Sequence, residues 1–143
     1  MSNIVKTDIG ICILRVSLGI VLIAHSLYLK VVVFTLPGTV EFFASIGLPG
    51  ALAYLVFMIE AIVGIALALG FRTQWFVALV IPVLLGATWA HWSSGWLFSN
   101  TGGGWEYPLF LSISAIALLF LGDGAYALKP QKVVGMRDVK QSL

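Results

Sequence analysis

The segment from Pro49 to Leu69, PGALAYLVFMIEAIVGIALAL, decides the fold class. Its one charged residue is Glu60, and its length suits a bilayer span, which takes about 20 apolar residues at 1.5 Å per residue. The rest of the chain has the same character, because its 143 residues are 60% hydrophobic and 10% charged. Water-soluble domains carry about 25% charged residues. The composition therefore predicts a membrane protein.

Four apolar segments predict an all-α membrane protein, an antiparallel bundle of four transmembrane helices in a single domain over residues 1–143. The helices are expected at about 9–34, 49–69, 73–92 and 106–126. The last segment reaches spanning length only if it continues beyond Leu121 toward Tyr126. An even number of spans places both termini on the same side of the bilayer.

The basic residues predict the orientation of this bundle. The expected turn between the second and third helices contains Arg72, whereas the connections 34–47 and 91–105 contain no Lys or Arg. Four more cations lie in the last fifteen residues, at Lys129, Lys132, Arg137 and Lys140. Because cytoplasmic loops are rich in Lys and Arg, both termini are expected in the cytoplasm of a bacterial inner membrane. The charge pattern indicates the lipid bilayer, and no nucleic acid, as a partner.

Two smaller features refine this picture. The first outward connection predicts a short interfacial helix at about 39–46, because Thr39 can cap a helix and Glu41 suits its first turn. The single cysteine, Cys12, excludes an internal disulfide and dithiol exchange within one chain.

Ionisable residues inside apolar spans are rare and usually face the interior of a bundle. Arg15 and Glu60 lie on the first two expected helices, which run in opposite directions. Counting the rise from the cytoplasmic ends places Arg15 about 9 Å deep and Glu60 about 15 Å deep, a difference that an arginine side chain spans. The sequence therefore predicts a buried Arg15–Glu60 ion pair that locks two helices. The alternative is that Glu60 carries protons or binds a quinone.

A second polar group is expected near the outer face. The same count places His25 about 24 Å deep on the first helix and His91 about 27 Å deep on the third. Glu106 begins the fourth helix at a similar level. Three interpretations remain open: a hydrogen-bonded cluster that closes the bundle, a site for the head group of a quinone or similar ring, or a metal site with two imidazoles and a carboxylate. The metal is the weakest, because no close ligand motif is present; we predict neither metal nor flavin.

The longest polar interruption, WAHWSSGWLFSNTGGGWEYPLF from Trp89 to Phe110, adds aromatic and glycine residues to this group. Its tryptophans suit either an interfacial belt or a wall that stacks on an aromatic ligand. The triple glycine permits a close backbone approach. The candidate ligand-binding residues are His25, His91, Asn100, Glu106, Tyr107, Trp92 and Trp105.

Several motifs along nearly the whole chain match a known family. With them, the sequence resembles the DoxX family of small four-helix membrane proteins. The final pair of motifs is the most specific part. The motifs are LRVSLG (Leu14 to Gly19), AH (Ala24, His25), FFASIGLP (Phe42 to Pro49), E-x3-G (Glu60, Gly64), H-x3-G-x2-F (His91, Gly95, Phe98) and GG-x-EYP (Gly103, Gly104, Glu106, Tyr107, Pro108).

The chain departs from the family pattern in two places. Family members often have Gly after the first-helix histidine and Lys four residues beyond it, whereas here Ser26 follows His25 and Lys30 lies five residues beyond it. The usual L-x-T-R turn reads Phe71-Arg72-Thr73-Gln74. These differences affect the expected role of Lys30 more than the family resemblance.

The resemblance implies a quinone-linked redox role. Namesakes of the family are similar to subunits of an archaeal quinol oxidase and of a thiosulfate:quinone oxidoreductase, and other members are linked to thiol and oxidative-stress complexes at the bacterial inner membrane. Because we predict no electron carrier in this chain, such a role implies a redox partner subunit. The alternatives are a non-catalytic scaffold or anchor subunit and, more weakly, a small permease, for which a homo-oligomer would widen the narrow path between four helices.

Cysteine labelling tests the predicted topology. Single cysteines introduced by Ser45→Cys and Ser142→Cys should react with a membrane-impermeant probe from opposite sides of the bilayer. Position 45 falls in the first outward connection, and position 142 falls in the cytoplasmic tail. Labelling of both positions from one side would contradict the four-span arrangement.

Overall fold

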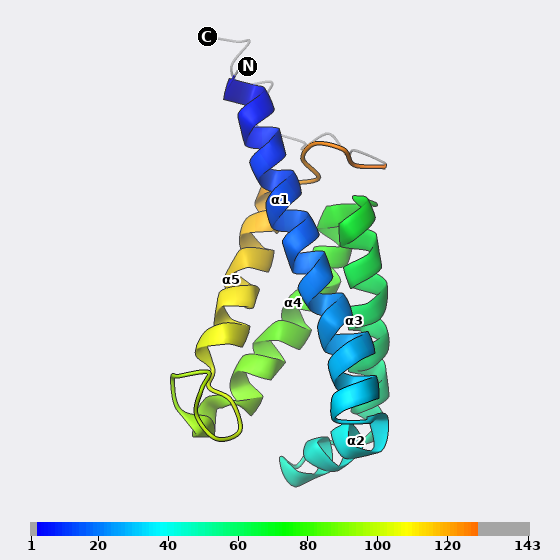
Figure 1. Cartoon of the computed structure of the whole chain (residues 1–143), viewed down its shortest axis with the longest axis vertical. Coiled ribbons are helices and arrows are strands. Elements are labelled where there is room, and N and C mark those ends of the chain that lie inside the picture. Colours follow the sequence, from blue (N-terminus) through cyan, green and yellow to red (C-terminus); the bar gives the residue numbers. More distant parts are fainter. Residues whose placement is uncertain (1–2, 129–143) are drawn as a thin grey trace.

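The computed structural model describes residues 3–128, and all its regular structure in that range is helical. The four cations of the predicted cytoplasmic tail lie outside the described residues. Helix α1 passes directly into a π-helix, η1, so that the two form one continuous segment (Figure 1). The elements are α1 (Asn3–Ile23), η1 (Ala24–Val33), α2 (Leu36–Ser45), α3 (Ala51–Leu69), α4 (Thr73–Ala90), η2 (Trp92–Ser94), a 3-10 turn, and α5 (Glu106–Leu121).

Three helical segments within the described residues are long and apolar enough to cross a membrane. They are Asn3–Val33, Ala51–Leu69 and Thr73–Ala90. The fourth apolar helix, α5, has only 16 residues. It ends at Leu121 rather than near Tyr126, because Gly122 takes a positive φ of 83° and turns the chain out of the helix.

The short helix α2 begins earlier than its sequence suggests. Thr35 is the N-cap, with its hydroxyl oxygen accepting a hydrogen bond from Gly38 N at 3.2 Å. Pro37 occupies the first turn, where a missing backbone N–H costs nothing. Thr39, the expected cap, is instead buried inside the helix and donates to Thr35 O at 2.9 Å.

The two ends of the molecule differ in their connections (Figure 1). The N-terminus and the tight turn between α3 and α4 lie at one end. At the other, the loop end, lie α2 and residues 91–105, which we call the Trp/Gly loop. Helix α1 packs against α3 and α5, and α4 packs against α3 and α5. Their shared core contains Leu18, Leu22, Val63, Leu67, Val77, Val80, Leu84, Leu111, Ala115 and Leu118.

Helices α1 and α3 approach each other closely at two glycines. A Cβ atom at Gly19 would lie 2.8 Å from Gly64 O, and one at Gly64 would lie 2.9 Å from Gly19 O. Small residues allow helix backbones to pack at this range inside membranes. The two positions are the glycines of the LRVSLG and E-x3-G motifs, so these motifs mark a helix crossing.

Arg15 is the most deeply buried charged residue among those described, with 1% of its surface exposed. Its guanidinium donates to Leu67 O and Ala68 O in the last turn of α3, at 2.5 and 3.3 Å. It also donates to Asp123 O at 2.9 Å and to Ala125 O at 3.1 Å, in the segment that follows α5. The last carbonyls of a helix lack partners within that helix and carry its negative dipole end. Arg15 therefore caps the C-terminal end of α3 and also holds residues 122–128 against it. We call residues 122–128 the closing segment.

The predicted Arg15–Glu60 ion pair is wrong. Glu60 pairs with Lys30 instead, and the donors of Arg15 go to backbone carbonyls. Glu60 lies seven residues before Leu67 along α3, which is about 10 Å along the helix axis. At the depth of Arg15 in the bundle lie the carbonyls of the last turn of α3 and of residues 122–128. The guanidinium group donates to these carbonyls and needs no carboxylate partner.

Replacing Arg15 should destabilise the bundle. We expect Arg15→Ala to lower the free energy of unfolding by about 3 kcal/mol or more, since each buried carbonyl left without a donor costs about 1–3 kcal/mol. Thermal unfolding in detergent measures the effect, with Lys6→Ala, an exposed cation on the same helix, as control. Adding Glu60→Gln should give an additive loss. A rescue by the second change would show that the two side chains are coupled after all.

Candidate functional site

The π-helix η1 places Lys30 one turn beyond His25. The backbone hydrogen bonds of a π-helix join residues five apart. In η1, for example, Phe34 N donates to Leu29 O at 2.8 Å. Residues at i and i+5 therefore follow one another along the same side, as i and i+4 do in an α-helix. Ser26 stands at the position of the usual glycine; it is fully buried, and its hydroxyl donates to Leu22 O at 2.9 Å.

Lys30 and Glu60 form a buried ion pair between η1 and α3. Lys30 Nζ donates to Glu60 Oε2, and their side chains are 14% and 8% exposed. Both residues belong to segments that are able to span a membrane. Ion pairs at such positions are costly to bury and commonly mark sites of function. The sequence analysis noted Lys30 only as a departure from the family spacing and gave it no partner, because five residues after His25 reach this face only in a π-helix.

His25 connects η1 to α5 through Tyr107. Their ring centroids lie 5.7 Å apart with an interplanar angle of 23°, a stacked arrangement. The His25 side chain is partly buried, and Tyr107 is 38% exposed. Two side chains that can both donate and accept hydrogen bonds thus lie together between η1 and the start of α5.

His91, at the end of α4, contacts both the Trp/Gly loop and α2. Its Nδ1 lies 2.9 Å from Gly102 O in the Trp/Gly loop. Its ring stacks on Phe42 of α2, with centroids 6.0 Å apart at an angle of 23°. Each of the two histidines therefore makes a ring contact with a different helix.

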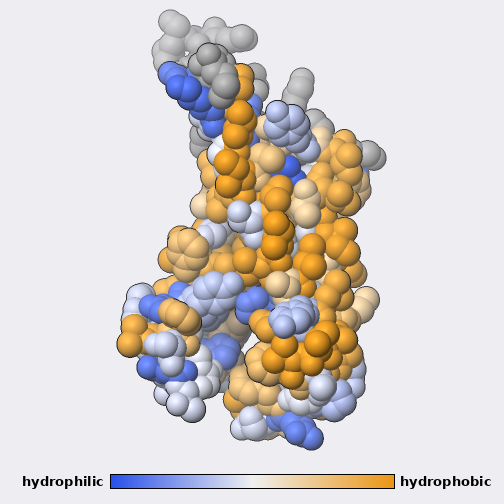
Figure 2. Space-filling model, in the orientation of Figure 1, coloured by the Kyte–Doolittle hydropathy of each residue, from blue (hydrophilic) through white to orange (hydrophobic). Residues whose placement is uncertain are grey.

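The surface is hollowed at the loop end (Figure 2). The hollow separates a lobe that contains the Trp/Gly loop from a lobe that contains α2, and hydrophilic residues lie at its inner end. The contacts of His25 with Tyr107 and of His91 with Phe42 join elements of these two lobes. The predicted histidines thus lie where the bundle opens.

The tryptophans of the Trp/Gly loop pack on one another. Trp92 stacks on Trp105 with centroids 4.7 Å apart, and Trp96 meets Trp105 edge-on at 4.5 Å. Trp105 is thereby the centre of the loop, and Trp92 and Trp96 remain largely exposed. Trp92 and Trp105, both candidates for ligand stacking, are thus also structural partners.

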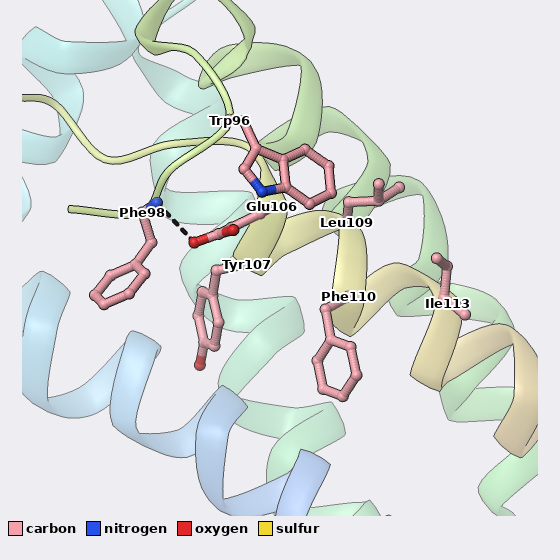
Figure 3. A pocket seen from close by; sticks show the side chains of 7 residues that line it. All are labelled: Trp96, Phe98, Glu106, Tyr107, Leu109, Phe110 and Ile113. Carbon is pink, nitrogen blue, oxygen red and sulfur yellow. Dashed lines mark hydrogen bonds between the residues drawn. The ribbon is translucent and has the colours of Figure 1, made fainter. Parts of the chain in front are cut away.

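Polar contacts complete the fold of this loop. Phe98 N donates to Glu106 Oε1 at 2.9 Å (Figure 3), and Asn100 Nδ2 donates to Ser94 O at 2.8 Å. Gly104 allows the two ends of the loop to approach, because a Cβ there would lie 2.2 Å from Leu97 O. Asn100 and Glu106 therefore hold the loop in place.

A shallow groove runs from the Trp/Gly loop along α5, with a volume of about 390 Å³. Aromatic rings dominate it, and the side chains of Leu109 and Ile113 extend it along the helix (Figure 3). The lining is almost entirely apolar, and Glu106 and Tyr107 are the lining residues whose side chains carry oxygen atoms. The lining residues are Trp96, Phe98, Glu106, Tyr107, Leu109, Phe110 and Ile113. The sequence analysis missed most of them, although residues 107, 110 and 113 follow a helical spacing that a search for an aromatic face would find.

The structure brings together only part of the predicted outer cluster. His25 lies with Tyr107, and Tyr107 shares the groove with Glu106. Within residues 3–128 no hydrogen bond joins His25, His91 and Glu106 to one another. In the same range no three His, Cys, Asp or Glu side chains are placed to hold a metal ion. The predicted cluster is therefore divided: His25 contacts α5, while His91 and Glu106 contact the Trp/Gly loop.

Comparison with known proteins identifies the family. The DoxX family model matches residues 10–92, which run from within α1 to beyond the end of α4 and include both histidines. This chain is a member of the DoxX family. It is 32% identical over 131 residues to "Putative oxidoreductase CatD" of Bacillus subtilis (strain 168), and the match covers 92% of each protein. No solved structure matches it. Family and apolar helices together indicate a membrane location.

The Lys30–Glu60 pair of this DoxX protein should show strong coupling. We expect Lys30→Met alone to lower the free energy of unfolding by about 3–5 kcal/mol, because it leaves a buried carboxylate without its partner. The double change Lys30→Met with Glu60→Gln should recover most of this loss. Thermal unfolding of the four proteins in detergent gives the coupling energy. Strictly additive losses would mean that the pair contributes nothing as a unit.

Proposed function

We propose that this DoxX protein is a quinone-linked membrane component of a redox system and that it binds a quinone ring at the loop end. In this proposal the helices form an antiparallel four-span bundle in a bacterial inner membrane, with both termini cytoplasmic. Helix α2 then lies at the interface, and the groove opens toward the outer half of the bilayer. The name of the Bacillus relative, "Putative oxidoreductase CatD", supports a redox role.

The observation that carries the proposal is the apolar, aromatic groove on α5, which Tyr107 helps to line. A quinone needs aromatic packing for its ring, hydrogen-bond donors for its two oxygens and an apolar track for its tail. Trp96, Phe98 and Phe110 supply aromatic surface beside Tyr107. Leu109 and Ile113 continue this surface along α5, as a membrane-embedded tail requires.

Hydrogen bonds to the ring would come from Tyr107 and His25. The Tyr107 hydroxyl is a donor within the groove, and the His25 imidazole stacked on it offers a second nitrogen-bound donor. Histidine also exchanges protons near neutral pH, which suits a ligand whose oxygens gain and lose protons. A bound quinone would supply electron transfer, in exchange with a redox partner subunit. The role of this chain is to bind and orient the ring.

Quinone titration tests the proposal. A short-tailed ubiquinone analogue should bind the purified protein at about one per chain. His25→Gln and Tyr107→Phe should each weaken binding by about 1–3 kcal/mol, the effect of one lost buried hydrogen bond. Tyr54→Phe, which removes a hydroxyl from an exposed tyrosine on α3, should leave the affinity unchanged. Equal affinity in all four proteins, or binding to none, would contradict the proposal.

The same series addresses a scaffold role. In a pure scaffold, His25 and Tyr107 only hold η1 against α5, so their replacement would lower the melting temperature and no quinone would bind. His91→Gln and Glu106→Gln complete the comparison, because both residues also hold the Trp/Gly loop. Their melting temperatures separate loss of the loop from loss of ligand contacts.

A further inference from the structure

The groove on α5 has two chemically different ends. At the end nearest the Trp/Gly loop it is lined by the rings of Trp96, Phe98 and Tyr107 (Figure 3). Farther along α5, Leu109 and then Ile113 present aliphatic side chains. The lining residues whose side chains carry oxygen also lie in the first turn of α5. A ring ligand is therefore oriented with its ring toward the loop and its aliphatic substituent along the helix.

The groove is short along the helix axis. Ile113 follows Glu106 by seven residues, which is about 10 Å along α5. A ring that packs between Tyr107 and Phe110 occupies the first turn of this length. The turn from Phe110 to Ile113 then remains, and its length of about 5 Å suits about one isoprene unit of a tail. The next exposed apolar residue of α5, Ile116, does not line the groove.

The surroundings of the groove decide how a tail contributes to affinity. Phe110 and Ile113 are 66% and 56% exposed, so the groove faces away from the bundle. In the proposed orientation this face contacts lipid, and lipid tails are as apolar as the groove. Transfer of a tail from lipid to the groove therefore yields no hydrophobic gain. Only the tail atoms that touch the protein contribute, through van der Waals contacts.

We propose that the groove recognises the ring of a prenylated quinone together with its first isoprene unit, and that the remainder of the tail stays in the lipid. Ile113 is the residue that contacts this unit. The ligand class is therefore membrane quinones of any tail length, in preference to quinones without a tail. This inference rests on the proposed function, because it needs a ring in the groove, and it adds the part of the ligand that the site selects.

Titrations with one head group and increasing tail length test this inference. Ubiquinones with no, one, two and four isoprene units are added to the purified protein in detergent. Affinities are expressed per mole of detergent, so that partitioning of the ligand into the micelle cancels. The first unit should raise the affinity about fivefold, the effect of a few added van der Waals contacts. Further units should leave the affinity unchanged, because they lie beyond the groove.

Two matched variants locate the effect on α5. Ile113→Ala should remove the gain from the first unit, whereas Ile116→Ala, the same change at an exposed position outside the groove, should keep it. Equal affinity for the tailless and one-unit ligands, a gain that continues with each unit, or a full gain in the Ile113→Ala variant would overturn the tail subsite and leave ring binding intact. Binding of none of the ligands to the wild type would overturn both proposals. The wild-type series needs no variant, so it tests the inference even if a variant does not fold.

Discussion

The rest of the structure depends on the burial of one guanidinium group. Arg15 reaches from α1 to the last carbonyls of α3 and to the closing segment, so it fixes three parts of the chain at one point. The backbone is shaped to accept it: Gly70 has a φ of 69°, and a Cβ there would lie 2.6 Å from the Arg15 Nη1 atom. The closing segment extends the arrangement to α4, because Asp123 Oδ1 accepts a hydrogen bond from Thr73 N at 2.9 Å.

The elements at the other end meet through a different kind of contact. Close packing at Gly19 and Gly64 holds α1 on α3, while at the loop end stacked rings contribute to the contact between neighbouring elements. Ring stacking contributes less free energy than a saturated network of charged hydrogen bonds. The network of charged hydrogen bonds and the ring contacts therefore lie at opposite ends of the bundle.

The sequence predicted the membrane class and the all-α fold well, because a lipid environment requires long runs of apolar residues, and such runs can be read directly from the sequence. The predicted partner of Arg15 was wrong, because helical rise gives only the depth of a residue in the bundle. It gives neither the direction of the side chain around the helix nor the backbone carbonyls that compete with Glu60 for the guanidinium group. Lys30 was missed because a π-helix has no spacing signal in a single sequence. The groove was missed because Trp96 and Phe98 reach α5 only through the fold of the Trp/Gly loop.

The π-helix also has a consequence for the direction of the side chains beyond it. One added residue in an α-helix turns everything beyond it by about 100°. In η1 each turn takes up more residues, so Lys30, five residues after His25, faces Glu60 on α3. Wound as an α-helix, the same ten residues would turn the Lys30 side chain away from α3 and leave the Glu60 carboxylate without its partner.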